Sequence, residues 1–350
     1  MRSIPFYPLM VVLLVGLGGY LGCDPNNVEI PGGLAPAANI EKATASGNFL
    51  NVPANATVNA TVNATVIPPR TTSTVIIGSF NMQRLGPSKL EDPWVMDRFA
   101  KIIQQFDVIA LQEITSSDQR TLPILVNLVN NSGGRYNYTI SPRIGRASTG
   151  YFEQYGYVFD TSRVQSSPEV CYVVADEADV LHREPFCGRF QTITPDARPF
   201  TFTLISMHTD PGEISHELDV LADVYRSVRQ YEYPEDDIIL LGDLNAPPKG
   251  LKSLGQIPDL VPVIQNVFTN TVQSKTLDNI LVDRLQTREF TGRAGIMSLE
   301  KMFGLETKDA GRISDHVPVW AEFTITEQPN ASVMVGNNPS NVVSPSNLVR

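Results

Sequence analysis

The sequence predicts an α/β protein whose sheets contain both parallel and antiparallel strands. Between residues 74 and 326, short apolar runs alternate with segments that repeat apolar residues at helical spacing. The last run, 317–325, instead alternates apolar and polar residues, which predicts an antiparallel strand with one exposed face. Polar residues able to bind metal or transfer protons follow several runs, and strand ends meet at one edge of such a sheet. These observations predict one catalytic domain with additional segments at both ends.

The elements follow in order from local signals. Asp92 before a proline is typical of a helix N-terminus, and Gly133 ends the next helical pattern. The expected elements are a strand at 75–80, a helix at 92–106, a strand at 108–111, a helix around 122–129, strands at 155–159 and 202–207, a helix at 213–230, and strands at 238–241 and 317–325. The alternation of strands and helices around an antiparallel strand indicates mixed sheets.

Composition limits the classes of function. The chain has 350 residues, 42% of them apolar, which is enough for one large core or two small ones. A net charge of -10 excludes a polybasic protein that holds nucleic acid by bulk electrostatics. A nuclease remains compatible with this charge, because a bound divalent cation and a few arginines can supply local positive charge.

The N-terminus has the pattern of a targeting segment. Arg2 is the only early charge, an apolar run follows, and Cys23 comes directly after it. We expect a signal peptide at 1–22 of the bacterial lipoprotein type, with Cys23 as the lipidated residue; an ordinary secretory signal or an uncleaved anchor is the alternative. In each case the rest of the chain is expected outside the cytoplasm, either secreted or anchored to the outer face of a membrane.

Residues 23–73 are expected to form a flexible linker. They are rich in Asn, Ala, Pro and Thr and contain three tandem copies of Asn-Ala-Thr-Val. The copies match glycosylation sequons at Asn55, Asn59 and Asn63, but a lipoprotein signal suggests a bacterium, so we favour an unmodified stalk with a reach of about 40 Å. The tail at 327–350 is expected to be disordered. The catalytic domain is expected at 74–326.

Cys171 and Cys187 are expected to form a disulfide. They lie in one predicted strand-loop-strand region, and thiols outside the cytoplasm tend to pair. Closing this short loop would contribute about 3 kcal/mol. No second ligand lies at metal spacing from either cysteine.

Several strand-end residues have the chemistry of a phosphodiesterase site. Glu113 and Asp315 offer the hard oxygens that Mg²⁺ prefers, with Mn²⁺ or Ca²⁺ as alternatives. Asn81 and Asn245 offer neutral oxygens for a cation or a phosphate. Taken singly, a Gly-Asp-x-Asn is often a turn, a Ser-Asp-His is as often a helix cap, and a strand-end glutamate is usually solvated. The order and spacing of the whole set favour one site.

Two histidines could move protons in that site. His316 is expected to act as the general base on an attacking water, because its ordinary pKa lies near neutrality, with Asp278 fixing its tautomer. His208 is expected to protonate the leaving oxygen or to bind phosphate, with Glu153 orienting it.

The region from 75 to 326 resembles the endonuclease/exonuclease/phosphatase superfamily, and specifically its deoxyribonuclease I branch. The motifs that carry the resemblance are Ser79-Phe80-Asn81-Met82-Gln83, Ile109-Ala110-Leu111-Gln112-Glu113, Arg183-Glu184-Pro185-Phe186, Gly242-Asp243-Leu244-Asn245-Ala246 and Ile313-Ser314-Asp315-His316-Val317-Pro318-Val319. The Arg-Glu-Pro element is similar to the nuclease branch rather than to the superfamily at large. The resemblance implies a four-layer α/β/β/α sandwich of two mixed β-sheets flanked by helices.

The resemblance also implies roles for individual residues. It assigns metal binding to Asn81, Glu113 and Asp315, and phosphate or metal contact to Asp243 and Asn245. It implies two carboxylate–imidazole pairs, Glu153 with His208 and Asp278 with His316. It makes Arg183 and Tyr151 contacts to the substrate, with Mg²⁺ as cofactor, Ca²⁺ support and DNA cleaved to 5′-phosphate ends. Arg84, Arg143 and Arg146 are either further DNA contacts or solvated arginines.

The sequence therefore predicts an endonuclease that degrades DNA outside the cytoplasm, with RNA as an open alternative and no protein partner expected. A phospholipid or inositol-phosphate phosphodiesterase is the rival enzyme, because the same core serves those substrates. A catalytically inactive binding module is the third reading, and it predicts loss of core residues that this chain retains.

Overall fold

The structure, a computed structural model, describes residues 65–195 and 198–329. The predicted signal peptide at 1–22, the lipidation site Cys23, most of the linker and most of the tail lie outside these residues. Within the described residues, no helix is long and apolar enough to cross a membrane.

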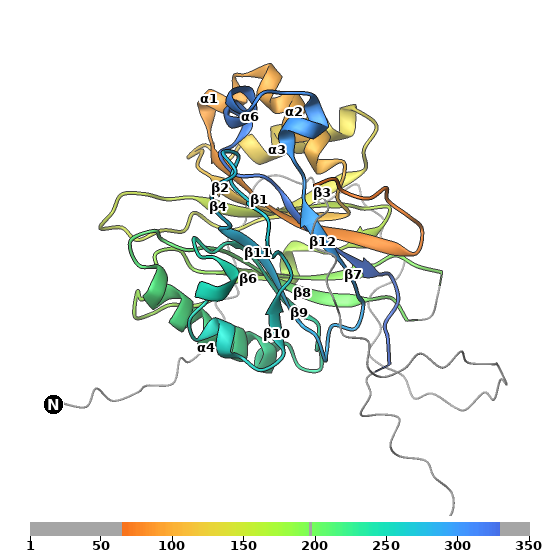
Figure 1. Cartoon of the computed structure of the whole chain (residues 1–350), viewed down its shortest axis with the longest axis vertical. Coiled ribbons are helices and arrows are strands. Elements are labelled where there is room, and N and C mark those ends of the chain that lie inside the picture. Colours follow the sequence, from red (N-terminus) through yellow and green to blue (C-terminus); the bar gives the residue numbers. More distant parts are fainter. Residues whose placement is uncertain (1–64, 196–197, 330–350) are drawn as a thin grey trace, which may run out of the picture. The chain divides into compact units, whose positions relative to one another are not determined.

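Two mixed sheets form the centre of the fold (Figure 1). The first has six strands in the order β12 (Phe290–Ile296), β13 (Val319–Thr324), β1 (Thr74–Leu85), β2 (Val108–Ile114), β4 (Gln154–Asp160) and β3 (Tyr136–Ile140). The second has seven strands, in the order β10 (Leu260–Pro262), β11 (Asp278–Asp283), β9 (Ile238–Asp243), β8 (Thr201–His208), β7 (Phe186–Thr192) and β5 (Val164–Gln165), with β6 (Cys171–Val173) also paired to β7.

Helices cover the outer faces of both sheets. Figure 1 shows α1 (Pro87–Leu90), α2 (Pro93–Ile103), α3 (Thr121–Asn131) and α6 (Thr307–Ile313) on one side, and α4 (Ile214–Glu232) on the other. The short helix α5 (Leu299–Phe303) precedes α6, and three 3₁₀ turns lie at Pro168–Val170, Pro248–Gly250 and Leu254–Gln256. One apolar cluster fills the space between the sheets and under α2 and α3, and a second lies under α4. This arrangement confirms the four-layer α/β/β/α sandwich.

Local sequence signals explain two elements near the site. The Asp92 side chain accepts hydrogen bonds from the amides of Trp94 and Val95, as expected for a helix N-cap. Gly242, near the end of β9, has a φ of +151°, and a Cβ there would lie 1.8 Å from the carbonyl oxygen of Met207. Because β8 and β9 approach so closely, only glycine fits before Asp243.

The strand directions place the predicted site residues at one edge. β1 runs parallel to β2, with Asn81 opposite Gln112, and β8 runs parallel to β9, with His208 opposite Asp243. β11 is antiparallel to β9, so its first residue, Asp278, also lies opposite Asp243. β13 is antiparallel to β1, and His316 precedes its first residue.

The expectation that the last strand is half-exposed is wrong. Trp320 and Glu322, predicted on the outer face of β13, are 1% and 2% exposed. Trp320 donates a hydrogen bond to the carbonyl of Ile296, and Glu322 pairs with Arg293 at 3.0 Å. The strand lies between β12 and β1 in the interior of a sheet, and a partner for the carboxylate makes burial of Glu322 tolerable.

The predicted disulfide is also wrong. Both thiols are free, although Cys171 and Cys187 lie on the neighbouring strands β6 and β7. Cys171 is paired with Gly188, and Cys187 with Tyr172. Because side chains alternate along a strand, this register directs the two thiols to opposite faces of the sheet. Cys171 packs on the cluster between the sheets and Cys187 belongs to the cluster under α4.

Residues on both sides of the expected domain also pack on it. Arg70, expected in the linker, forms ion pairs with Asp107 and Asp160, each at 2.5 Å. Glu327, expected in the tail, accepts a hydrogen bond from the amide of Thr201 at 2.8 Å.

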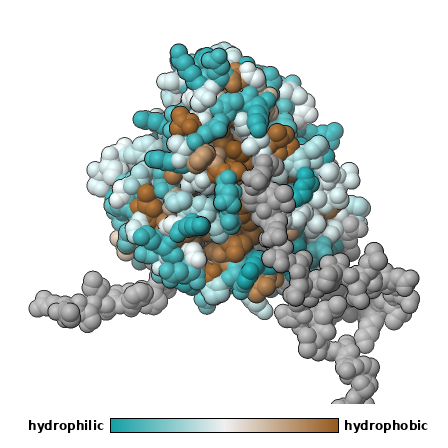
Figure 2. Space-filling model, viewed as in Figure 1, coloured by the Kyte–Doolittle hydropathy of each residue, from teal (hydrophilic) through white to brown (hydrophobic). Residues whose placement is uncertain are grey.

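The face seen in Figure 2 is mostly hydrophilic, with hydrophobic patches separated by polar side chains.

Candidate active site

Asp243 lies at the centre of the group of predicted catalytic residues. Its Oδ2 lies 3.5 Å from Nε2 of His316 and 3.6 Å from Nε2 of His208, and it accepts a hydrogen bond from Asn81 at 3.0 Å. Asp243 is 1% exposed. Burial alone would raise the pKa of this carboxyl, but the two imidazoles and the hydrogen bonds from Asn245 and Asn81 hold it below its ordinary value. Asp243 is therefore a carboxylate at neutral pH.

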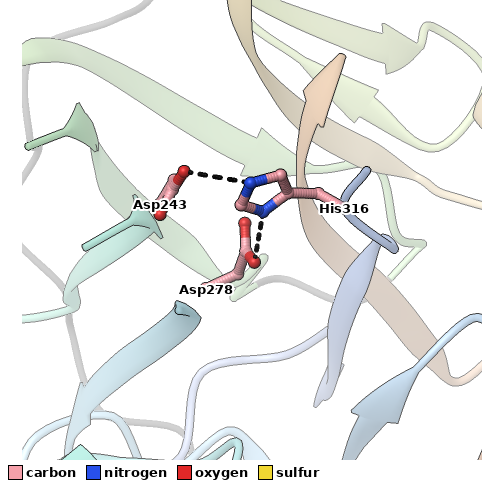
Figure 3. A group of neighbouring side chains, drawn as sticks. All are labelled: Asp243, Asp278 and His316. Carbon is pink, nitrogen blue, oxygen red and sulfur yellow. Dashed lines mark hydrogen bonds and ion pairs between the residues drawn. The ribbon is translucent and has the colours of Figure 1, made fainter. Parts of the chain in front are cut away.

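The predicted pair of Asp278 and His316 is present (Figure 3). Nδ1 of His316 lies 2.8 Å from Oδ2 of Asp278, and Nε2 points toward Asp243. Burial alone would lower the pKa of His316, but the charges of Asp278 and Asp243 raise it to about 10. The pKa of His316 thus lies well above the ordinary near-neutral value of histidine, because two buried carboxylates contact one imidazole.

The second predicted pair, Glu153 with His208, is also present. Nδ1 of His208 lies 3.1 Å and 3.2 Å from the two carboxylate oxygens of Glu153, which is fully buried. Burial opposes protonation, but Glu153 and Asp243 raise the pKa of His208 above its ordinary value. The Tyr151 hydroxyl donates a hydrogen bond to Glu153 at 2.9 Å, so this tyrosine contacts the carboxylate that holds His208.

Glu113 lies beside these residues at the end of β2. Its two oxygens accept hydrogen bonds from the Asn81 side chain at 2.9 Å and from the Arg84 amide at 2.8 Å. Nε2 of His208 lies 4.0 Å from Glu113. Glu113 and Asn245 both have positive φ, at 60° and 49°. Such strained backbone is retained where surrounding structure holds it, and it concentrates at functional sites.

Two further predicted residues, Asn245 and Asp315, lie at the rim. The side chain of Asn245 donates to the carbonyl of Thr209 at 2.9 Å, and its amide donates to Asp243 at 3.0 Å. Asp315 is exposed, and its carbonyl accepts from Thr271. Asp243, Asp278 and His316 bring ligand atoms within 4.8 Å of one another. The metal set of Asn81, Glu113 and Asp315 stays a prediction.

Lys89 is a site neighbour that sequence reasoning missed. Its ammonium donates to the carbonyls of Met82 and Ile313, each at 2.7 Å. Burial lowers the pKa of Lys89 to about 8, while the charges of Asp315 and Glu113 act in the opposite direction. A lysine in a short polar segment after a strand carries no signal that could have identified it, because its role depends on two distant chain segments.

Arg183, predicted to contact the substrate, is buried beside the Glu153–His208 pair. It is 3% exposed, and its Nε donates to the carbonyl of His208 at 2.8 Å and lies 3.9 Å from Glu153. Its guanidinium lies 5.7 Å from the centre of the Tyr151 ring. Removing it would therefore disturb the Glu153–His208 pair and the packing around it.

Two of the three arginines considered as further DNA contacts, Arg143 and Arg146, bind other groups of the protein. Arg143 donates to the carbonyls of Thr115, Ser116 and Phe152. Arg146 pairs with Glu213 at 3.0 Å. These contacts reduce their availability for phosphate, whereas the side chain of Arg84 is exposed.

The donors at this edge fit a hard divalent cation. Glu113 and Asp243 supply carboxylate oxygens, and the amide of Asn81 lies between them. Oxygen ligands with one or two carboxylates are what Mg²⁺ requires. Two buried imidazoles, each held by a carboxylate and each directed at Asp243, can bind a phosphate and transfer protons on two sides of it.

Comparison with known proteins relates this geometry to a family. Residues 78–316 match the Endonuclease/Exonuclease/phosphatase family. The chain is 33% identical over 263 residues to Deoxyribonuclease-1-like 1 of Chlorocebus aethiops, covering 72% of this chain and 85% of that protein. It is 33% identical over 262 residues to human Deoxyribonuclease gamma, covering 69% and 84%. The human Nocturnin catalytic domain has a similar fold, with a TM-score of 0.51 at 14% identity over 73% of this chain and 94% of that domain.

Proposed function

Because this chain belongs to the Endonuclease/Exonuclease/phosphatase family and is a phosphodiesterase of that family, we propose that it is a metal-dependent, DNase I-like endonuclease. One observation carries the proposal: two carboxylate–imidazole pairs converge on Asp243. The Nε2 atom of each imidazole lies within 3.6 Å of Oδ2 of Asp243. Relatives whose names are those of deoxyribonucleases, at 33% identity, further support the proposal.

The proposed reaction is hydrolysis of a DNA phosphodiester by water. His316 takes a proton from the attacking water once its Nε2 is free of a proton, and Asp278 holds its ring in place. His208, oriented by Glu153, donates a proton to the leaving oxygen. Asn245 at the rim contacts the phosphate. Because Asp278 and Asp243 raise the pKa of His316 to about 10, activity that depends on its neutral form should increase with pH.

The proposed cofactor is Mg²⁺, with Mn²⁺ or Ca²⁺ as substitutes. Glu113, Asn81 and Asp315 would hold the cation, with Asp243 beside them. When bound, it would neutralise charge on the phosphate oxygens as the bond breaks. Exclusion of water from Asp243, which is 1% exposed, strengthens each electrostatic contact at this point.

The proposed location is outside the cytoplasm. The support is the N-terminal pattern of Arg2, an apolar run and Cys23. We propose that the enzyme is secreted or is anchored through Cys23 to the outer face of a membrane, and that it acts there on DNA.

The test is cleavage of supercoiled plasmid by the chain from residue 24 onward, because residues 65–73 contact the domain. Reactions contain Mg²⁺, Mn²⁺, Ca²⁺ or a chelator. His316→Ala is compared with His216→Ala, an exposed histidine on α4. Metal-dependent nicking that only His316→Ala loses supports the proposal.

Parallel reactions with RNA, single-stranded DNA, phospholipid and inositol phosphate separate the rival readings. If the enzyme cleaves a lipid or inositol phosphodiester and does not nick plasmid, its substrate class is that phosphodiester and not DNA. A folded protein inactive on every substrate would support a binding module instead.

A further inference from the structure

A second group of acidic residues lies at the end of the sheets opposite the active site. Asp237, Glu289 and Glu327 bring carboxylate oxygens within 4.8 Å of one another. Asp237 directly precedes β9, whose other end is Asp243, so the two groups are separated by about six strand residues, or ~20 Å. The group therefore does not belong to the active site.

The three carboxylates come from different parts of the fold. Asp237 enters the second sheet through β9, Glu289 lies in the connection from β11 to β12, and Glu327 follows β13 of the first sheet. The main chain fixes these positions: the carbonyl of Asp237 accepts from Thr203, and the carbonyl of Glu289 accepts from Thr324. The group thus lies where the ends of the two sheets approach each other.

Buried oxygens in this group lack hydrogen-bond partners. Oδ1 of Asp237 and Oε2 of Glu289 are each inaccessible and unpartnered, and the two residues are each 1% exposed. Unsatisfied buried oxygens cost about 1–3 kcal/mol each, so this many at one point indicates a missing positive partner.

Among residues 65–195 and 198–329, no Lys, Arg or His forms an ion pair with Asp237, Glu289 or Glu327. Gln328 donates its amide to Glu289, and Thr201 donates its amide to Glu327. These contacts bring no positive charge to the three carboxylates.

We propose that Asp237, Glu289 and Glu327 bind a structural Ca²⁺ ion that links the two sheets. Ca²⁺ accepts several carboxylates in flexible geometry, whereas Mg²⁺ keeps its waters and rarely occupies an all-protein carboxylate cage. Ca²⁺–oxygen bonds of about 2.3–2.6 Å allow one ion to contact carboxylate oxygens that lie within 4.8 Å of one another. Glu327 is only partly buried, so an ion can enter from solvent.

The test measures Ca²⁺ binding to the chelator-treated chain from residue 24 onward at pH 7.5, by calorimetry and by thermal unfolding. The variant is Glu289→Gln, which preserves shape while removing one charge; Asp237→Asn serves as a second variant. Glu177→Gln is the matched exposed control. Glu113→Gln identifies calcium bound at the active site.

We expect saturating Ca²⁺ to raise the melting temperature of the original protein by about 5 °C. Glu289→Gln and Asp237→Asn should each lose one bound ion and this shift, whereas Glu177→Gln should keep both and Glu113→Gln should keep the shift. Plasmid nicking in Mg²⁺ should persist in Glu289→Gln. Unchanged calcium stoichiometry and melting shift in both site variants, or equal stabilisation by Mg²⁺, would overturn the assignment.

Discussion

Replacing Asp278 with asparagine tests the central pair of the proposed mechanism. Asp278 accepts a hydrogen bond from Nδ1 of His316 at 2.8 Å and is 1% exposed. Asparagine has nearly the same shape, so the packing of β11 should be preserved. The change removes one negative charge, and its amide can also donate to Nδ1 and so favour the tautomer with Nε2 protonated.

The expected shift in the pKa of His316 follows from the geometry. Two unit charges about 4 Å apart in an effective dielectric of about 20 interact by about 4 kcal/mol, which corresponds to about 3 pKa units. Burial opposes the charged imidazole, and Asp278 and Asp243 together raise its pKa to about 10. Without the Asp278 charge, the pKa of His316 should fall toward its ordinary value near 6.5.

The assay is the rate of plasmid nicking between pH 5 and pH 10 at saturating Mg²⁺. A general base is active when unprotonated, so a lower pKa moves the acidic limb of the profile to lower pH. The plateau rate should fall by about 10² to 10⁴, because the ring is no longer held in the productive tautomer. Asp223→Asn, an exposed change on α4, is the control. If Asp278→Asn keeps both the limb and the plateau of the original enzyme, His316 is not a base held by Asp278.

Three further predictions concern the cation, the strand approach and the thiols. Glu113→Gln should reduce nicking by at least about 10² with an unchanged circular dichroism spectrum, because one carboxylate ligand is lost at a partly exposed position; near-normal rates at low Mg²⁺ would contradict this. Gly242→Ala should destabilise the protein by more than about 3 kcal/mol in denaturant unfolding, since the new Cβ would lie 1.8 Å from the carbonyl oxygen of Met207; a soluble variant of normal stability would show that the strands separate easily. Mass spectrometry of the unreduced protein should find Cys171 and Cys187 as two free thiols, and a reductant should leave the melting temperature unchanged; a peptide linking them would refute the observed strand register.

Sequence alone determined the fold class and most of the candidate site. Strand ends at Asn81, Glu113, His208 and Asp243 were visible because apolar runs stop there and polar residues begin. The N-cap at Asp92 was visible because an aspartate before proline has a local cause. The short strands β5, β6 and β10 were not predicted, because two or three residues carry no periodic signal.

Tertiary structure decided whatever depended on register, burial or distant partners. Sequence spacing predicted that Cys171 and Cys187 lie close together. The register of β6 on β7 instead directs the two thiols to opposite faces of the sheet. The composition of β13 suggested an exposed face, but its interior position buried Glu322.

The same limit applies to the electrostatics of the site. An isolated histidine has a near-neutral pKa, but two carboxylates brought from β9 and β11 raise that of His316 to about 10. Local chemistry can be read along a chain because its causes are neighbours in sequence. A shifted pKa, the burial of a side chain and the register of a strand all depend on neighbours in space. Only the folded chain supplies these neighbours.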